Sequence, residues 1–302
     1  SLSLAVILMA FSLNADRKGI FTLMIFLSAG LYQPSIHLFL VLTIIEWTIS
    51  LYKNPTALKK STLTAGTRLM EFFIGILAYF LLYKLLGCQN HYSLVHSKFA
   101  LTSPTLLTLI TSNFQNYLSL FFLMLKSTPL LLIITLIAGV GTFLSTLKYR
   151  HLIWLSPFLM IIASMACFLF LKNPIFLPRV LTSFSGVTLF VGLSFAYLSE
   201  KKRYWGFLLI PFIGFSFSYA FAYGNALKAQ HQYEYFIEAQ IAAEIANLNL
   251  KISSISTAGT PPLSNQARLI SLKFPALIPM ILSSEWSAWA VTARLENDGI
   301  VY

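Results

Sequence analysis

Long apolar runs, each about 15 to 20 residues and separated by short basic clusters, dominate the chain up to residue 223. A helix needs about 20 apolar residues to cross about 30 Å of hydrocarbon, and it satisfies its own backbone hydrogen bonds there. The pattern predicts an all-α polytopic membrane protein with about eight transmembrane helices. We place them at residues 1–13, 19–32, 34–52, 69–86, 128–146, 152–171, 180–198 and 205–223.

The basic residues of this region are distributed unevenly between the two faces. Eleven fall in alternate connections, namely Arg17, Lys18, Lys53, Lys59, Lys60, Arg68, Lys148, Arg150, Lys201, Lys202 and Arg203. The opposite connections hold five, namely Lys84, Lys98, Lys126, Lys172 and Arg179. Cytoplasmic connections carry the excess of Lys and Arg. The pattern therefore predicts a multi-pass membrane protein whose C-terminus lies on the non-cytoplasmic side.

Two segments leave alternatives open. Residues 20–51 are too long for one ordinary span, and we interpret them as a hairpin turning at 31–34, where Pro34 lacks an N–H and biases Gln33 away from helix. The alternative is a single kinked helix, which would put one basic flank on the wrong face. Residues 87–128 are expected to lie along the interface as an amphipathic helix. A further short span there would break the alternation of charge.

The composition changes after residue 223. Residues 224–302 carry five Lys or Arg and six Asp or Glu, and an Ala-rich run at 225–250 has the spacing of an amphipathic helix. Residues 251–256 alternate like a strand, and 257–262 are a breaker cluster. We predict a transmembrane helical domain at 1–223 and a small extracytoplasmic α+β tail at 224–302.

Composition narrows the class of protein. The chain is 57% hydrophobic and 10% charged, against about 25% charged in soluble domains, which excludes a water-soluble fold. The net charge of +11 fits basic cytoplasmic loops, and no nucleic acid partner is expected. Cys88 and Cys167 are too far apart in the predicted topology to pair. Because Ser1 stands inside an apolar run without a Met, we expect a further N-terminal part.

Motifs of soluble enzymes are absent, including phosphate-binding loops, HExxH, CxxC and GxSxG. His91 and His96 are poorly spaced for one helical face, so we predict no metal site and assign no cofactor. Glu46 and Glu71 are charges inside predicted helices and are candidates by default. With Arg68 nearby, a structural ion pair or a snorkelling contact is the favoured interpretation.

Arg179 is a candidate phosphate-binding residue. It stands on the outer face where a helix begins, so its guanidinium and the free N–H groups of that helix can face one anion. A headgroup anchor without a catalytic role explains its charge equally well. Tyr32 and Gln33 at the hairpin tip, with Tyr223 and Asn225 at the last membrane exit, are candidate sugar contacts on the same face. Polar residues also occur at such turns without any ligand.

Residues 27–34, 178–181 and 219–227, the last followed by a Gln-rich helix, together resemble the serotype-converting Gtr glucosyltransferases of the type-II branch. The resemblance covers most of the chain and implies a GT-C-like fold. It implies transfer of a glucosyl group from undecaprenyl phosphate to a lipopolysaccharide O-antigen sugar at the outer leaflet. In such enzymes an outer carboxylate is the base and a basic residue stabilises the departing phosphate. Arg179 fits the second role.

The catalytic base is unknown. The Asp and Glu residues before residue 224 are at 16, 46, 71 and 200, at or near the predicted cytoplasmic face. We therefore expect the base to precede Ser1 and these residues alone to be inactive. A tail acid such as Glu234 or Glu238 that folds over the site is the alternative.

Other function classes stay open. A lipid-linked oligosaccharide flippase or transporter would need a charged pathway at mid-membrane, and the predicted helices offer Glu46 and Glu71 near one face. An O-antigen polymerase or a non-catalytic scaffold is a further alternative. The expected partners are a polyprenyl-phosphate-linked sugar donor, a glycan acceptor and the lipid bilayer.

Overall fold

The computed structural model describes residues 5–8, 11, 19–53, 56, 58–87, 98–100, 104–126, 150–176, 180, 182–201, 207, 209–247 and 262–281. Across these residues the secondary structure is helical, with one isolated antiparallel bridge between Phe99 and Leu171 and no strand. The all-α class is confirmed for this part of the chain. The chain divides into two compact units. One is made of residues 1–121 and 130–212, and the other is made of residues 122–129 and 213–302.

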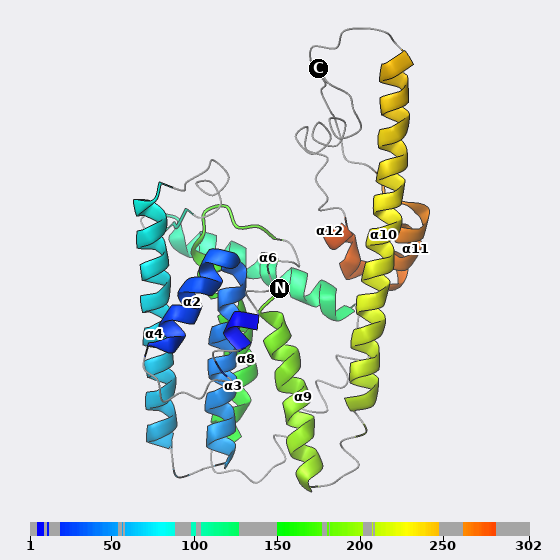
Figure 1. Cartoon of the computed structure of the whole chain (residues 1–302). Helices are drawn as coiled ribbons and strands as arrows, with labels where there is room; N and C mark the ends of the chain where they lie inside the picture. The colour runs from blue at the N-terminus through cyan, green and yellow to red at the C-terminus, as the bar shows by residue number, and fades with distance from the viewer. Residues whose placement is uncertain are drawn as a thin grey trace. The chain divides into compact units, whose positions relative to one another are not determined.

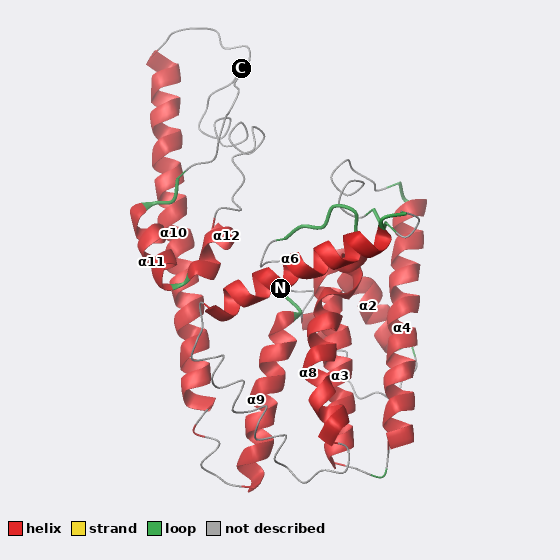
Figure 2. Cartoon of the chain, turned by 180° about the vertical axis from the view of Figure 1, so that it is seen from behind, coloured by secondary structure: helices red, strands yellow, loops and turns green. Residues whose placement is uncertain are grey.

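The first unit is a group of helices with one helix across its end. Its elements are α2 (Ile20–Leu31), η1 (Gln33–Ile36), α3 (His37–Lys53), α4 (Leu58–Leu85), most of α6 (Leu106–Lys126), α8 (Arg150–Met165), η2 (Ala166–Phe170) and α9 (Phe184–Lys201). α3 packs against α4, α8 and α9, and α2 packs against α4. Figures 1 and 2 show α3, α4, α8 and α9 running side by side, with α6 crossing at one end.

The α2–α3 hairpin confirms the predicted turn. α2 ends at Leu31, Tyr32 is extended with φ −163°, and Pro34 stands in the first turn of η1. Hydrogen bonds to α4 give the direction of α2. Gly19, before α2, donates to Glu71, and Gln33, after α2, donates to Tyr79. α2 therefore runs parallel to α4. Because Glu46 meets Arg68 and Ser50 meets Ser61, α3 runs antiparallel to it. The single kinked helix is wrong.

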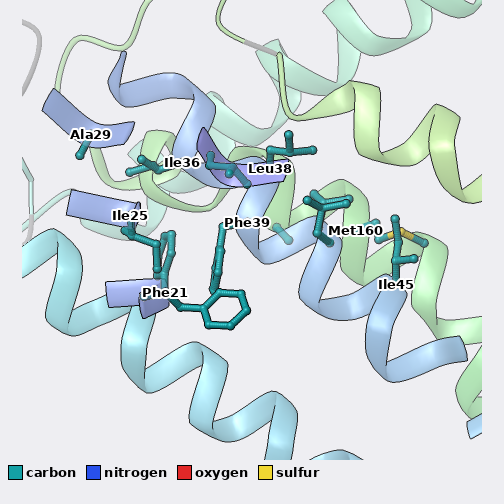
Figure 3. Close-up of a cluster of buried hydrophobic side chains, with 13 residues drawn as sticks. Phe21, Ile25, Ala29, Ile36, Leu38, Phe39, Ile45 and Met160 are labelled. Carbon is teal, nitrogen blue, oxygen red and sulfur yellow. The ribbon is translucent and has the colours of Figure 1, made fainter. Parts of the chain in front are cut away.

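A cluster of apolar side chains fills the centre of this unit. Figure 3 shows Phe21 and Ile25 of α2 facing Phe39 of α3, with Met160 of α8 on the other side of α3. All four side chains are at most 2% exposed. Because lipid is as apolar as these side chains, close van der Waals packing among them, rather than removal from water, stabilises this contact in a membrane. This cluster fixes where the hairpin tip lies.

Two helices of the described chain are long and apolar enough, by length and composition, to cross a membrane: Gln33–Lys53 and Leu58–Leu85. Shorter apolar helices cover Ile20–Leu31, Leu155–Phe170 and Phe184–Ser194. The predicted span 128–146 and most of 1–13 lie outside the described residues, so the count of eight stays a prediction. The helix that contains the predicted span 69–86 is longer than the span, because α4 begins at Leu58 and includes Lys59, Lys60 and Arg68.

α6 has one buried face, as an amphipathic helix should. Asn113, Tyr117 and Leu120 are at most 8% exposed, whereas Leu107 is 80% exposed. The spacing of three and four residues places the buried side chains on one stripe. α6 is not among the helices apolar enough to span. This favours the interfacial interpretation over a further short span, while His91 and His96 lie outside the described residues.

The second unit is built on one long helix. α10 (Leu209–Asn247) has 39 residues without a break, a length of about 58 Å. The two helices predicted at 205–223 and 225–250, with a membrane exit between them, are therefore one helix. α11 (Asn265–Lys273), η5 (Pro275–Leu277) and α12 (Ile278–Ile281) follow. Their side chains pack on α10, with Ala226, Phe274 and Leu277 in the core. The strand predicted at 251–256 lies outside the described residues, and the α+β tail and the domain boundary at residue 224 stay predictions.

Candidate functional site

A cavity of about 530 Å³ lies beneath the tip of the α2–α3 hairpin. Its walls come from the hairpin tip, from α4, from η2 and from residues that follow η2. The lining residues that matter below are Tyr32, Gln33, His37, Tyr79, Phe168 and Val180. Most of the remaining wall is aliphatic or aromatic, as at Ile36, Ile76 and Phe80. An apolar cavity with a few placed polar groups is typical of a small-molecule site.

The polar edge of this cavity is a hydrogen-bonded pair from two helices. Gln33 Nε2 donates to Tyr79 Oη at 3.0 Å, and Gln33 is exposed. The amide oxygen of Gln33 can accept and the Tyr79 hydroxyl can donate, which together match a sugar hydroxyl. Sequence reasoning missed Tyr79, because one Tyr in an apolar helix carries no signal until the hairpin tip is placed beside it.

His37 joins the hairpin tip to η2, which follows α8 directly. Its Nε2 accepts the Cys167 N–H at 3.1 Å, so the proton is on Nδ1, which donates to the Pro34 carbonyl at 3.0 Å. The ring is 1% exposed and its centroid lies 4.4 Å from that of Phe168. Both ring nitrogens are therefore occupied in the neutral form. Sequence reasoning left His37 without a role, since its partner is far away in the chain.

The far wall of the cavity is supported by α6. Asn113 Nδ2 donates to the carbonyls of Leu169 and Leu171 at 3.1 and 3.0 Å. Tyr117 Oη donates to the Ile175 carbonyl at 3.2 Å, and burial raises the pKa of this phenol, which stays protonated. α6 thus holds the segment that leads from α8 toward residue 179.

The structure brings together part of the predicted site. Tyr32 and Gln33 line the cavity, and so does Val180. Arg179, directly before Val180, lies outside the described residues. Tyr223 and Asn225 are half-buried in the interior of α10 in the second unit, so their predicted position at a turn is wrong. Their role as sugar contacts stays a prediction.

The acidic residues proposed as alternative bases are buried in the second unit. Glu234 and Glu238 are 2% and 3% exposed. Glu234 accepts from Gln230 Nε2 at 3.0 Å, and Gln230 Oε1 accepts the Ser264 N–H at 2.8 Å. This network joins α10 to the segment before α11, which is a packing role within that unit.

The ion pair predicted around Arg68 is confirmed. Its Nε lies 3.5 Å from Glu46 Oε2 and its Nη1 lies 3.5 Å from Glu71 Oε2. Among the residues that the structure describes, no group of three or more His, Cys, Asp or Glu side chains could hold a metal ion.

Comparison with known proteins gives one match to report. Over 140 residues the chain is 35% identical to a protein of Salmonella phage P22 named "Uncharacterized 55.3 kDa protein in gtrB 5'region". The match covers 43% of this chain and 28% of that protein. The chain is similar to a phage protein encoded beside gtrB. No family model matches the chain, and no solved structure does.

Proposed function

We propose that this chain is part of a membrane glycosyltransferase that moves a glucosyl or other hexosyl group from a polyprenyl-phosphate sugar to lipopolysaccharide O-antigen or a related surface glycan. The observation that carries the proposal is the hairpin-tip cavity. Its mostly apolar wall includes the hydrogen-bonded pair Gln33 and Tyr79, and it also includes Val180, the residue after Arg179. The likeness to a phage protein encoded in the gtrB 5' region supports a role in glycan modification.

The proposed reaction uses these groups in separate roles. The apolar wall takes the first isoprene units of undecaprenyl phosphate, and Gln33 with Tyr79 binds hydroxyls of the sugar. Arg179 pairs with the phosphate. It stabilises the negative charge that develops on the phosphate as the bond between the sugar and the phosphate breaks. The reaction takes place at the outer leaflet of a bacterial inner membrane, with residues 224–302 in the periplasm. The base on the acceptor hydroxyl has no assigned residue.

The test is transfer of labelled glucose from undecaprenyl phosphate glucose to lipopolysaccharide in membranes that contain the full-length protein. Arg179→Ala should lower transfer by about 10² or more, the usual effect of removing one transition-state charge donor. Lys172→Ala is the matched control, because Lys172 is a basic residue of the same segment that does not line the cavity. Equal transfer by Arg179→Ala and the wild type, with equal insertion, would refute the phosphate role.

A lipid-linked oligosaccharide flippase is the second candidate, because charged side chains between helices are typical of transport pathways. The Arg68 cluster between α3 and α4 is the observation in its favour. Movement of a lipid-linked sugar across vesicle membranes without a new glycosidic bond would support the flippase and contradict the transferase.

A further inference from the structure

A second cavity, of about 280 Å³, lies between α3 and α4 at the opposite end of α3 from the hairpin tip. It is lined by Thr43, Glu46, Trp47 and Ser50 of α3 and by Lys60, Ser61, Thr64 and Ala65 of α4. Six of its eight lining residues carry a hydroxyl, carboxylate or ammonium group. The proposed transferase reaction makes no use of it.

The ion-paired cluster beside this cavity, Arg68 with Glu46 and Glu71, has one more negative than positive charge, and the ammonium group of Lys60, which is treated below, also lines the cavity. Arg68, 4% exposed, pairs with both Glu46 and Glu71, and the Phe21 ring covers its guanidinium at 3.5 Å. Glu71 Oε1 also accepts the Gly19 N–H at 3.4 Å, and its side chain is only 13% exposed. One guanidinium thus serves two carboxylates. The surplus charge faces the cavity, because the Glu46 side chain lines it and is 39% exposed.

The hydroxyl groups around Glu46 present oxygen lone pairs to the cavity. Thr43 donates its proton to the Phe39 carbonyl at 2.9 Å, and Thr64 donates to the Lys60 carbonyl at 3.1 Å. Ser50 and Ser61 share one hydrogen bond of 2.6 Å. A hydroxyl that has given its proton to the backbone can act only as an acceptor. These oxygens, together with the carboxylate, are complementary to a positive charge.

We propose that this cavity binds a small monovalent cation, Na⁺ or K⁺. Glu46 supplies the charge, and Thr43, Thr64 and the Ser50–Ser61 pair supply neutral oxygen ligands. A single surplus charge balances a monovalent ion, whereas Ca²⁺ sites use several carboxylates and Mg²⁺ demands a strict octahedron. The proposal stands independently of the transferase reaction.

The rival occupant is the ammonium group of Lys60, which also lines the cavity. Among the described residues, Lys60 forms no ion pair with Glu46, since no nitrogen–oxygen distance between them is 4.0 Å or less. The ion pairs of Glu46 and Glu71 are with Arg68. The two occupants predict opposite effects of Lys60→Gln. If a solvent cation binds, removing the like charge of Lys60 strengthens binding. If Lys60 is the counter-ion, its removal destabilises the protein.

The experiment measures the thermal unfolding midpoint of the purified full-length protein in NaCl, KCl and N-methylglucamine chloride at equal ionic strength. A ligand that binds only the folded state raises the midpoint. We expect a higher midpoint in NaCl or KCl than in N-methylglucamine for the wild type, a larger difference for Lys60→Gln and none for Glu46→Gln. Glu46→Gln leaves Arg68 paired with Glu71, so the variant should fold.

Glu244→Gln, which changes an exposed acid of α10, is the matched control and should keep the wild-type response. Equal midpoints in the three salts for both the wild type and Lys60→Gln would overturn the proposal. A midpoint lowered by Lys60→Gln in every salt, without cation dependence, would overturn it in favour of Lys60.

Discussion

The contact between α2 and α4 depends on Gly75, so Gly75→Ala should destabilise the protein. A Cβ atom at this position would lie 2.8 Å from the Thr22 carbonyl oxygen and 3.0 Å from two carbon atoms of Ile25. The carbonyl is part of the α2 backbone, and Ile25 is 0% exposed in the central cluster. Neither neighbour can move aside without shifting α2. Overpacking of this kind costs about 1 to 3 kcal/mol.

The same substitution elsewhere in α4 gives a control of opposite sign. At Gly66 an added Cβ meets no atom within 4 Å. There Ala should stabilise the helix by up to about 1 kcal/mol through its higher helix propensity. At Gly75 the same gain offsets part of the clash with the carbonyl at 2.8 Å, and a net loss of up to about 2 kcal/mol remains.

The assay is the unfolding midpoint of the full-length protein in detergent, measured for the wild type and both variants under one condition. Gly75→Ala should unfold at a lower temperature and Gly66→Ala at the same or a higher one. Because the hairpin tip follows α2 directly, Gly75→Ala should also weaken the binding of any ligand to the hairpin-tip cavity. A Gly75→Ala variant as stable as Gly66→Ala would refute the close approach of α2 to α4.

Three further substitutions test the contacts described above. His37→Phe removes the acceptor of the Cys167 N–H and should lower the unfolding free energy by about 1 to 3 kcal/mol, measured by denaturant titration; an unchanged midpoint would contradict the bridge. Asn113→Leu leaves two carbonyls of the cavity wall without their donor and should cost a similar amount, with limited proteolysis showing earlier cleavage near residue 171; cleavage at the wild-type rate would contradict it. Arg68→Met leaves Glu46 and Glu71 without their guanidinium partner, although Glu71 keeps the Gly19 N–H, and should lower the unfolding free energy by up to about 3 kcal/mol, since Glu46 is partly exposed. The measurement is the folded yield, and a wild-type yield would show that the ion pair contributes little to stability.

Local features of the sequence predicted part of the fold correctly. Pro34 after a polar tip residue predicted the hairpin, because the absent N–H and the restricted Gln33 act within two residues. Arg68 near Glu46 and Glu71 predicted the ion pair. The same local reasoning does not predict that α4 begins at Leu58, since Lys59 and Lys60 stand in a predicted connection. Helical backbone hydrogen bonds tolerate exposed Lys side chains, so charge alone does not end a helix.

The sequence also does not predict that the span at 205–223 and the helix at 225–250 are one helix, α10. Gly224 and Asn225 are typical of a helix end, but here they continue the helix. Ala226, one residue later, is 0% exposed and packs in the core with Phe274 and Leu277. Packing of this helix against a segment about fifty residues away along the chain overrides the weak local preference.

By itself the sequence determined the helical class, the hairpin tip and the presence of Tyr32 and Gln33 on it, because each follows from hydrophobic pattern and backbone restrictions within a few residues. Only the tertiary structure decided that Tyr79 meets Gln33 and that His37 accepts from Cys167. It also decided that Glu46 lines a cavity together with the hydroxyl side chains of two helices. These contacts join residues of different helices, and their geometry depends on how the helices pack, which no local pattern encodes.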